Sequence, residues 1–210
     1  MSDAARYHHL PQLRMEIRGV AERFAGDGRP TPPAGYGLRT FRPGDEDAWL
    51  ELLLSGEFGA WTRTRLDLML GHPHVRVPRG GIFFATVDDQ PVGTASTYLH
   101  PVDDGGIDPE LGWVVVAPGH RGRGLGRLVC WTVLQFIGRL GYEHAYLLTD
   151  DFRMLAIQTY LKLGFEPALV DPSHAERWGA IHRQLARETT PPLPHAGEEA
   201  GGHGETGAPW

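Results

Sequence analysis

The chain has 210 residues, of which 41% are hydrophobic and 22% charged, and its formal net charge at pH 7 is −6. This length suits one globular domain, the acidic balance argues against a nucleic-acid partner, and no apolar run reaches the roughly 20 residues of a membrane span. The single cysteine, Cys130, excludes an internal disulfide and a cysteine-based zinc site, and no metal site is expected. Because the N-terminus lacks the apolar core of a signal peptide, we expect a cytoplasmic protein.

Residues 1–35 are expected to form an N-terminal extension that ends in a linker. Proline and glycine interrupt any periodic pattern over residues 26–35, which predicts the linker. Two patterns compete before it: a set of residues spaced as on one face of a helix, and an alternation at Leu13, Met15 and Ile17 that is typical of a strand. The helical set is Leu13, Ile17, Val20, Ala21 and Phe24.

Residues 36–187 are expected to form the folded domain, and their first half alternates strand and helix patterns. Asp45 and Glu46 favour a helix start because acidic residues suit the positive end of a helix. Thr62 is a suitable N-cap for a second helix, which Gly71 would end. The elements predicted here are a strand at 36–42, helices at 44–54 and 62–70, and hairpin strands at 82–87 and 92–99.

The second half of the domain predicts a strand–helix–strand unit. Residues 111–117 are apolar on both faces, as in a buried central strand. The segments after it are a helix at 124–140, a strand at 144–149, a helix at 152–163, and a last segment at 174–186 that fits a helix or a strand followed by a helix. Together these patterns predict an α/β or α+β domain with a mixed sheet. Residues 188–210 cannot bury a core, which predicts a disordered tail.

A segment rich in glycine and arginine, residues 120–128 (HRGRGLGRL), joins the apolar strand to the helix after it. Its backbone amides and the positive end of the helix favour an anion such as a phosphate. Two phosphate-binding patterns fail on spacing. Leu125 stands where a Walker A loop needs lysine, and the dinucleotide fingerprint would need glycine at Arg127 or Val129. The pattern Arg/Gln-x-x-Gly-x-Gly/Ala fits residues 121–126.

This loop and residues 156–165 (AIQTYLKLGF) resemble the two signature motifs of the GNAT superfamily of acetyl-CoA-dependent N-acetyltransferases, and the resemblance covers about residues 36–170. It implies an α/β fold with a mixed, mostly antiparallel sheet, a central parallel strand–helix–strand unit that binds coenzyme A, and flanking helices. It also implies transfer of an acetyl group from acetyl-CoA, as co-substrate, to a primary amine of a small molecule or a protein. Homodimers are common among such proteins, and no nucleic-acid or membrane partner is expected.

The resemblance places coenzyme A on the glycine-rich loop and on the strand before it. Backbone amides of the loop would hold the diphosphate, and a backbone N–H within residues 114–116 would polarise the thioester carbonyl. Many relatives carry asparagine where this chain has Arg153, which could instead pair with a phosphate. The coenzyme-binding residues implied in this way are Val114, Val115, Val116, Arg121, Gly122, Arg123, Gly124, Leu125, Gly126, Arg127 and Arg153.

Two residues are candidates for proton transfer. Tyr160 matches the family tyrosine that protonates the departing thiolate, although its place on an apolar helix face also fits a core aromatic. As an acid, its ionisation would limit activity at alkaline pH. Glu110 stands eleven residues before Arg121, as does the glutamate base of the histone-acetylating branch, and a solvent-facing glutamate at a strand start is the alternative.

The acceptor pocket of the family corresponds here to residues 55–61. In that segment Glu57, Phe58 and Trp61 suit a cationic group. Two other functions stay open at this stage. One is transfer of a different acyl group or transfer to a different acceptor, and the other is a non-catalytic sensor that binds coenzyme A.

Overall fold

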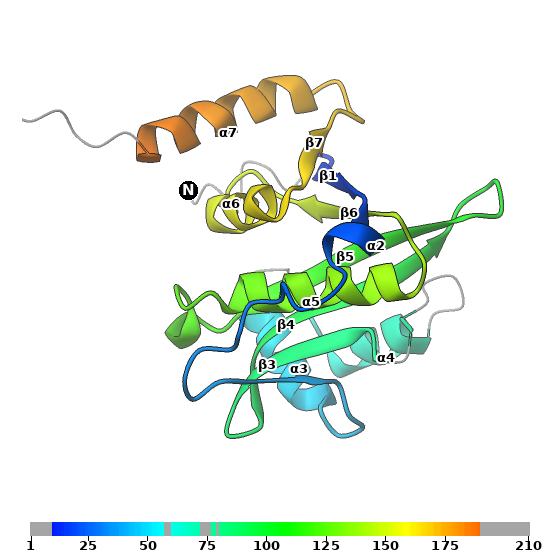
Figure 1. Cartoon of the computed structure of the whole chain (residues 1–210), viewed down its shortest axis with the longest axis vertical. Helices are drawn as coiled ribbons and strands as arrows, with labels where there is room; N and C mark the ends of the chain where they lie inside the picture. The colour runs from blue at the N-terminus through cyan, green and yellow to red at the C-terminus, as the bar shows by residue number, and fades with distance from the viewer. Residues whose placement is uncertain (1–9, 57–59, 72–76, 79, 190–210) are drawn as a thin grey trace, which may run out of the picture.

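The fold is built on a seven-stranded sheet with the order β2-β3-β4-β5-β6-β1-β7 (Figure 1). The structure is a computed structural model that describes residues 10–56, 60–71, 77–78 and 80–189. Neighbouring strands are antiparallel except β5 and β6, which are parallel, as the predicted mixed sheet requires. The strands are β1 Leu13–Arg18, β2 Gly37–Thr40, β3 Ile82–Val87, β4 Gln90–Pro101, β5 Ile107–Val116, β6 His144–Thr149 and β7 Glu166–Ala168.

Helices cover both faces of the sheet. On one face α5 buries Leu128, Val129 and Val133 in the larger hydrophobic core, and on the other α3 and α4 pack around Trp49 and Phe84. Among the described residues, no helix is long and apolar enough to cross a membrane. The helices are α2 Val20–Arg23, α3 Glu46–Ser55, α4 Arg63–Gly71, α5 Leu125–Arg139, α6 Met154–Leu163 and α7 His174–Thr189, with a short 3-10 turn, η1, at Pro118–His120.

The N-terminal segment contributes a strand to the interior of the sheet. Strand β1 pairs antiparallel with β6 on one side and with β7 on the other. Leu13, Met15 and Ile17 are fully buried, whereas Arg14 and Glu16 between them are half-buried. The strand alternation is therefore confirmed and the helical stripe is wrong over residues 13–18, because each of these apolar side chains meets the core only if the backbone is extended. Although an N-terminal extension ending at residue 35 was expected, β1 belongs to the same sheet as the strands that follow that residue.

Most of the other predicted elements are confirmed to within a few residues. Strand β5 begins at Ile107, four residues earlier than predicted, and the short edge strand β7 was not predicted at all. The last segment is a single helix, α7, which continues to Thr189 and so extends into the predicted tail. The remainder of that tail, residues 190–210, lies outside the described residues.

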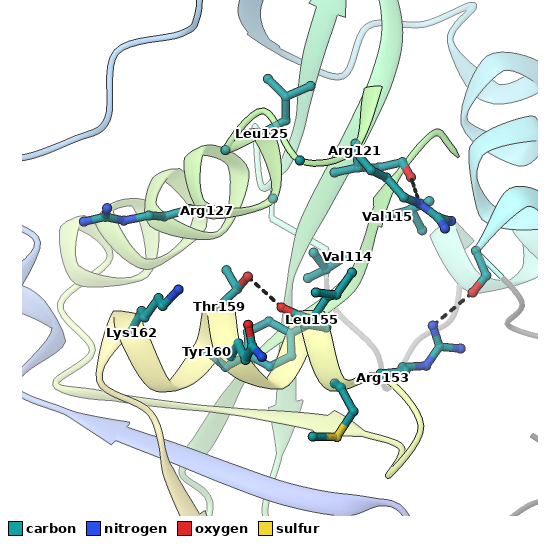
Figure 2. A pocket seen from close by; sticks show the side chains of 18 of the residues that line it. Val114, Val115, Arg121, Leu125, Arg127, Arg153, Leu155, Thr159, Tyr160 and Lys162 are labelled. Carbon is teal, nitrogen blue, oxygen red and sulfur yellow. Dashed lines mark hydrogen bonds between the residues drawn. The ribbon is translucent and has the colours of Figure 1, made fainter. Parts of the chain in front are cut away.

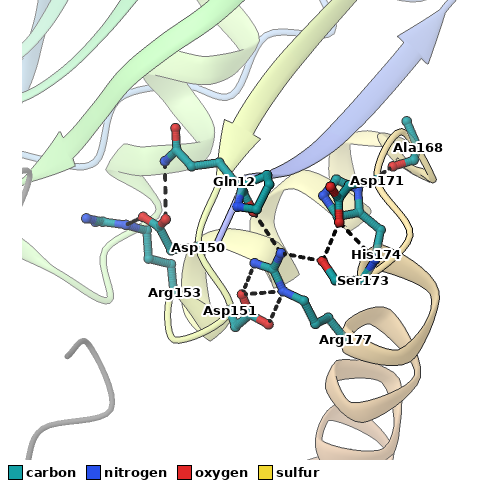
Figure 3. A network of polar contacts seen from close by, with 10 residues as sticks. Gln12, Asp150, Asp151, Arg153, Ala168, Asp171, Ser173, His174 and Arg177 are labelled. Atoms are coloured by element: carbon teal, nitrogen blue, oxygen red, sulfur yellow. Dashed lines mark hydrogen bonds and ion pairs between the residues drawn. The ribbon is translucent and has the colours of Figure 1, made fainter. Parts of the chain in front are cut away.

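A buried ion pair joins α7 to the rest of the domain (Figure 3). The Arg177 guanidinium on α7 donates to the carboxylate of Asp151, which lies between β6 and α6, and each side chain is only 9% exposed. It also donates to the backbone carbonyl of Pro11, just before β1, at 2.7 Å. Three segments that are distant in the sequence are thus held together by one side chain.

Candidate active site

A cavity opens where β5 and β6 separate. Among the described residues these two parallel strands pair only at Glu110 and Tyr146. Beyond that pair the end of β5, the start of α5 and the helix α6 enclose a cavity of about 520 Å³, within the usual size of a ligand pocket (Figure 2). Its lining residues are Gly56, Val114, Val115, Val116, His120, Arg121, Gly122, Gly124, Leu125, Gly126, Arg127, Phe152, Arg153, Met154, Leu155, Ala156, Gln158, Thr159, Tyr160 and Lys162.

A β-bulge at Trp113 accompanies this separation. The φ angle of Trp113 is 51°, in the left-handed region that non-glycine residues rarely adopt. Opposite it, the pairing register of β4 with β5 shifts between Thr94 and Ser96. Because a bulge bends its strand and increases the local twist, β5 leaves β6 at this point.

The end of β5 presents backbone N–H groups to the cavity. The N–H of Ala117 donates to the carbonyl of Val92 on β4 at 2.9 Å. Since backbone groups alternate sides along a strand, Val115 faces β4 as Ala117 does, while Val114 and Val116 direct their N–H groups toward the opening. The side chain of Val115 is buried against α3 and α4 on the other face of the sheet.

The glycine-rich loop closes one end of the cavity. Gly122 and Gly124 have φ angles of 74° and 79°, which glycine adopts without strain, and Gly124 is the N-cap of α5. The Arg121 Nε donates to the carbonyl of Val116 at 3.0 Å and so fixes the loop to the end of β5. The first amides of α5 and the positive end of its dipole are therefore available to an anion.

The charge of the cavity also suits an anion. Its lining includes Arg121, Arg127, Arg153 and Lys162, and none of the described lining residues is acidic, although the chain as a whole carries a net charge of −6. The structure does not bring Arg123 to this cavity, and its side chain is exposed. A polyanionic ligand would therefore find several cations together with the loop amides.

Tyr160 is both a core residue and a wall of the cavity. It is 6% exposed, packs edge-to-face against Phe165 with ring centroids 6.1 Å apart, and also lines the cavity. Burial raises the pKa of the Tyr160 phenol far above its ordinary value. The hydroxyl is therefore protonated at any ordinary pH and can donate a hydrogen bond.

Arg153 is held by protein groups at the opposite end of the cavity from Arg127. Its Nε donates to Asp150 at 3.0 Å, and its guanidinium also donates to the backbone carbonyl of Gly56, just after α3, at 3.0 Å (Figure 2). Arg153, the N-cap of α6, therefore links α6 to the end of α3. A contact between Arg153 and a phosphate stays a prediction.

Glu110 lies on the opposite face of the sheet from α5. Its strand neighbour Leu111 packs in the core beneath α5, and successive side chains of a strand alternate between faces. A second, smaller cavity of about 40 Å³ adjoins the main one, and Val114 and Tyr160 line both. Glu110 lines neither cavity. Its carboxylate is instead held by His100, at 2.7 Å, and by Tyr146, at 3.2 Å.

Comparison with known proteins places the chain in a family. Residues 46–165, more than half of the chain, match the sequence profile described as the acetyltransferase (GNAT) family. The chain belongs to the GNAT acetyltransferase family. The match begins at α3 and ends just after α6, so it contains the bulged strand, the glycine-rich loop and Tyr160.

Relatives in the GNAT family share about a third of their residues with this chain. A mycothiol acetyltransferase of Geodermatophilus obscurus is 32% identical over 172 residues, which are 78% of this chain and 54% of the relative. A mycothiol acetyltransferase of Frankia alni is 34% identical over 189 residues, which are 84% and 55% of the two proteins. The chain therefore spans about half the length of the curated relatives it matches.

Solved GNAT structures share the fold at lower identity. A tandem GNAT protein from the clavulanic acid biosynthesis pathway superposes with a TM-score of 0.56 at 21% identity, over 75% of this chain and 50% of that protein. A GCN5-related N-acetyltransferase from Sphaerobacter thermophilus gives 0.53 at 24% identity, over 75% and 49%. Both likenesses support the GNAT fold.

The expected GNAT acceptor segment is only partly described. Glu57 and Phe58 lie outside the described residues. Trp61 is 5% exposed, because its indole packs edge-to-face against Trp113 at 4.7 Å and lies under the guanidinium of Arg65 at 4.5 Å. The Trp61 ring, which was expected to line an open pocket, is thus buried and packs against Trp113 in the bulge.

Several lining residues of this GNAT cavity were missed by the sequence prediction. They are Gly56, His120, Phe152, Met154, Leu155, Ala156, Gln158, Thr159 and Lys162. Most belong to α6, where Ala156 lies four residues before Tyr160 and where Leu155, Thr159 and Lys162 follow one another at spacings of four and three, so helical periodicity could have identified them. His120 is held by a hydrogen bond between its Nδ1 and the Tyr36 hydroxyl, 3.0 Å apart. No sequence pattern connects these two residues.

Proposed function

We propose that the chain transfers an acetyl group directly from acetyl-CoA to a primary amine. The observation that carries this proposal is the cavity between β5 and β6, which combines an amide-rich loop, cationic walls and backbone donors in one place. Relatives named mycothiol acetyltransferase favour a small molecule over a protein as the acceptor. Membership in the GNAT family agrees with this chemistry.

Coenzyme A would bind with its diphosphate at the glycine-rich loop. The backbone amides of residues 122–127 supply donors at the positive end of α5. Arg121 is tied to the carbonyl of Val116, which leaves Arg127 and Lys162 as the cations with the most freedom to follow a phosphate. The apolar side chains of Leu155 and Val114 then suit the uncharged arm of the coenzyme.

The thioester carbonyl would lie against the end of β5. As the amine attacks, negative charge develops on the carbonyl oxygen, and an N–H of Val114 or Val116 is already oriented to receive it. The C–N bond forms and the C–S bond breaks. The departing thiolate takes a proton from Tyr160, and the phenol regains one from the nitrogen of the tetrahedral intermediate through water.

Glu110 would be the base that prepares the amine. A primary amine with a pKa near 10.4 arrives protonated, so one proton must leave before it can attack. Glu110 belongs to the last residue pair before β5 and β6 separate, on the face opposite α5. The acceptor would therefore approach from that face, while acetyl-CoA enters between α5 and α6.

A thiol-release assay with a panel of amines tests this function. The panel contains polyamines, amino sugars, amino acids and short peptides, each with acetyl-CoA and, in parallel, with longer acyl-CoA esters. We expect release of free thiol with at least one small amine, with acetyl-CoA as the best donor, and loss of release in Glu110→Gln. Binding of acetyl-CoA without release for any amine would contradict the proposal and favour a sensor.

A further inference from the structure

The two oxygens of Glu110 have different surroundings. Oε2 is 2.7 Å from Nε2 of His100 and accepts a hydrogen bond from the Tyr146 hydroxyl at 3.2 Å. No described residue donates a hydrogen bond to Oε1. The side chain is only 17% exposed, so its orientation is set by these two partners, which come from the strands on either side of β5.

Oε1 of Glu110 lies beside Gly112, on the same face of β5. A Cβ atom at Gly112 would lie 3.3 Å from Oε1 of Glu110 and 3.1 Å from the ring of Tyr98. Gly112 is the next residue but one along β5, immediately before the bulge at Trp113. Oε1 is therefore turned toward the point where β5 and β6 separate, and any side chain at position 112 would crowd it.

The partners of Oε2 are themselves held in place by aromatic and charged neighbours. The His100 ring stacks on Tyr98 at an interplanar angle of 30°, and its centroid is 6.0 Å from that of Tyr146. The guanidinium of Arg14, from β1, lies 3.9 Å from the centre of the Tyr146 ring and pairs with Asp108 at 2.9 Å. Burial and the nearby carboxylates raise the pKa of Tyr146, so its hydroxyl stays protonated and donates.

We propose that His100 and Tyr146 are positioning residues that hold Glu110 by Oε2 so that Oε1 takes the proton of the acceptor amine. His100 presents Nε2–H to the carboxylate, and its exposed edge lies toward solvent. Both donors contact Oε2, and no described residue donates to Oε1. The inference rests on the proposed function, because Glu110 must be the base.

The proton transfer to Glu110 requires no other reactant. The ammonium proton passes to Oε1, directly or through one water, and leaves the nitrogen lone pair free to form the C–N bond. Glu110 then returns its proton to solvent and regains its charge. His100 and Tyr146 keep their own protons throughout, so they act through Glu110 and do not touch the substrate.

Steady-state kinetics on variants of His100 and Tyr146 test this arrangement. His100→Ala should lower kcat by about 10- to 100-fold, the worth of a hydrogen bond to a charged group, with an unchanged KM for acetyl-CoA. Tyr146→Phe should act in the same direction, and His100→Gln should recover much of the rate because its amide can donate.

His144→Ala is the matched control. This histidine lies two residues before Tyr146 on β6 and contacts the carboxylate of Asp108 at 3.1 Å, not that of Glu110. It should keep the wild-type rate and pH profile. In a Glu110→Gln background, His100→Ala should cause no further loss of kcat, because His100 acts only through the carboxylate that Glu110→Gln has already removed.

A spectroscopic measurement separates this inference from the proposed function. Nitrogen NMR of the imidazoles should show His100 as the Nε2–H tautomer in the wild type, and this preference should be lost in Glu110→Gln. An active enzyme with wild-type kcat in His100→Ala, or an Nδ1–H tautomer in the wild type, would overturn the inference alone. A wild type that acetylates no amine would instead overturn the proposed function, and the inference with it.

Discussion

The environment of Tyr160 decides how this side chain can act. Its ring is buried against Phe165, and the residue lines both the main cavity and the smaller one. The expected alkaline limb from ionisation of this phenol is wrong, because burial moves its pKa well above the ordinary range of assays. A loss of activity at high pH would have another cause.

Replacing Tyr160 by phenylalanine separates the hydroxyl from the ring. Since the ring is kept, the free energy of unfolding should change by only about 1 kcal/mol. If the phenol supplies the proton to the leaving thiolate, kcat should fall by about 10²- to 10⁴-fold with little change in KM for acetyl-CoA. Tyr142→Phe, which changes a half-buried tyrosine between α5 and β6 outside the cavity lining, is the control. A wild-type kcat in Tyr160→Phe would leave the residue a core aromatic only.

At the scale of elements, the cavity depends on two features, the glycine-rich loop and the bulge in β5, and only the first can be recognised in the sequence. The glycine-rich loop requires glycine at Gly122 and Gly124, where φ is positive, so its position is visible in the residues themselves. The bulge at Trp113 has no such mark, because it places a tryptophan in a left-handed conformation. Only the pairing of β4 with β5 reveals it.

Strand β1 is an element whose role depended on partners far along the chain. It pairs with β6 and β7, so it cannot be placed before those strands are known. It also brings Arg14 over Tyr146, which links the N-terminal segment to the surroundings of Glu110. The family profile begins only at residue 46, and so this strand lies outside the matched region.

The burial of β1 predicts a large effect from a small change. Met15 is 0% exposed, so Met15→Ala should lower the free energy of unfolding by about 2–5 kcal/mol, as removal of a buried side chain usually does. Arg18→Ala, at the exposed end of the same strand, should change it by less than about 0.5 kcal/mol. Denaturant unfolding measures both. Equal, small effects would mean that residues 13–18 are a detachable extension.

Sequence patterns identified the parts of the fold and site that depend on local order. Helix caps, the hairpin turn and the glycine loop each need particular residues at fixed spacing, as at Thr62, whose hydroxyl accepts a hydrogen bond from the N–H of Arg65 at 3.1 Å. The contacts of Glu110 could not be predicted in this way. His100 and Tyr146 reach it only through the register of β4 with β5 and of β5 with β6.

At the scale of the whole molecule, the described residues that line the cavity come mainly from the end of β5, the glycine-rich loop, α5 and α6, with Gly56 just after α3. The matches cover only about half of each curated relative, so we treat activity within these 210 residues as a claim that needs its own test. Strand β1 lies between β6 and β7 in the sheet, and α7 is joined to the domain by the ion pair of Arg177 with Asp151. We therefore expect the chain to bind its co-substrate unaided.

Calorimetric titration of acetyl-CoA into the 210-residue chain tests this claim most directly. The wild type should bind one molecule per chain, and Gly124→Glu should weaken binding by about 100-fold or more, because it puts a carboxylate where the loop amides meet a phosphate. Gly141→Glu is the control, since Gly141 also has a positive φ of 90° and open space around it but lies at the other end of α5. It should bind as the wild type does. No binding by the wild type, or equal binding by a folded Gly124→Glu variant, would contradict the account.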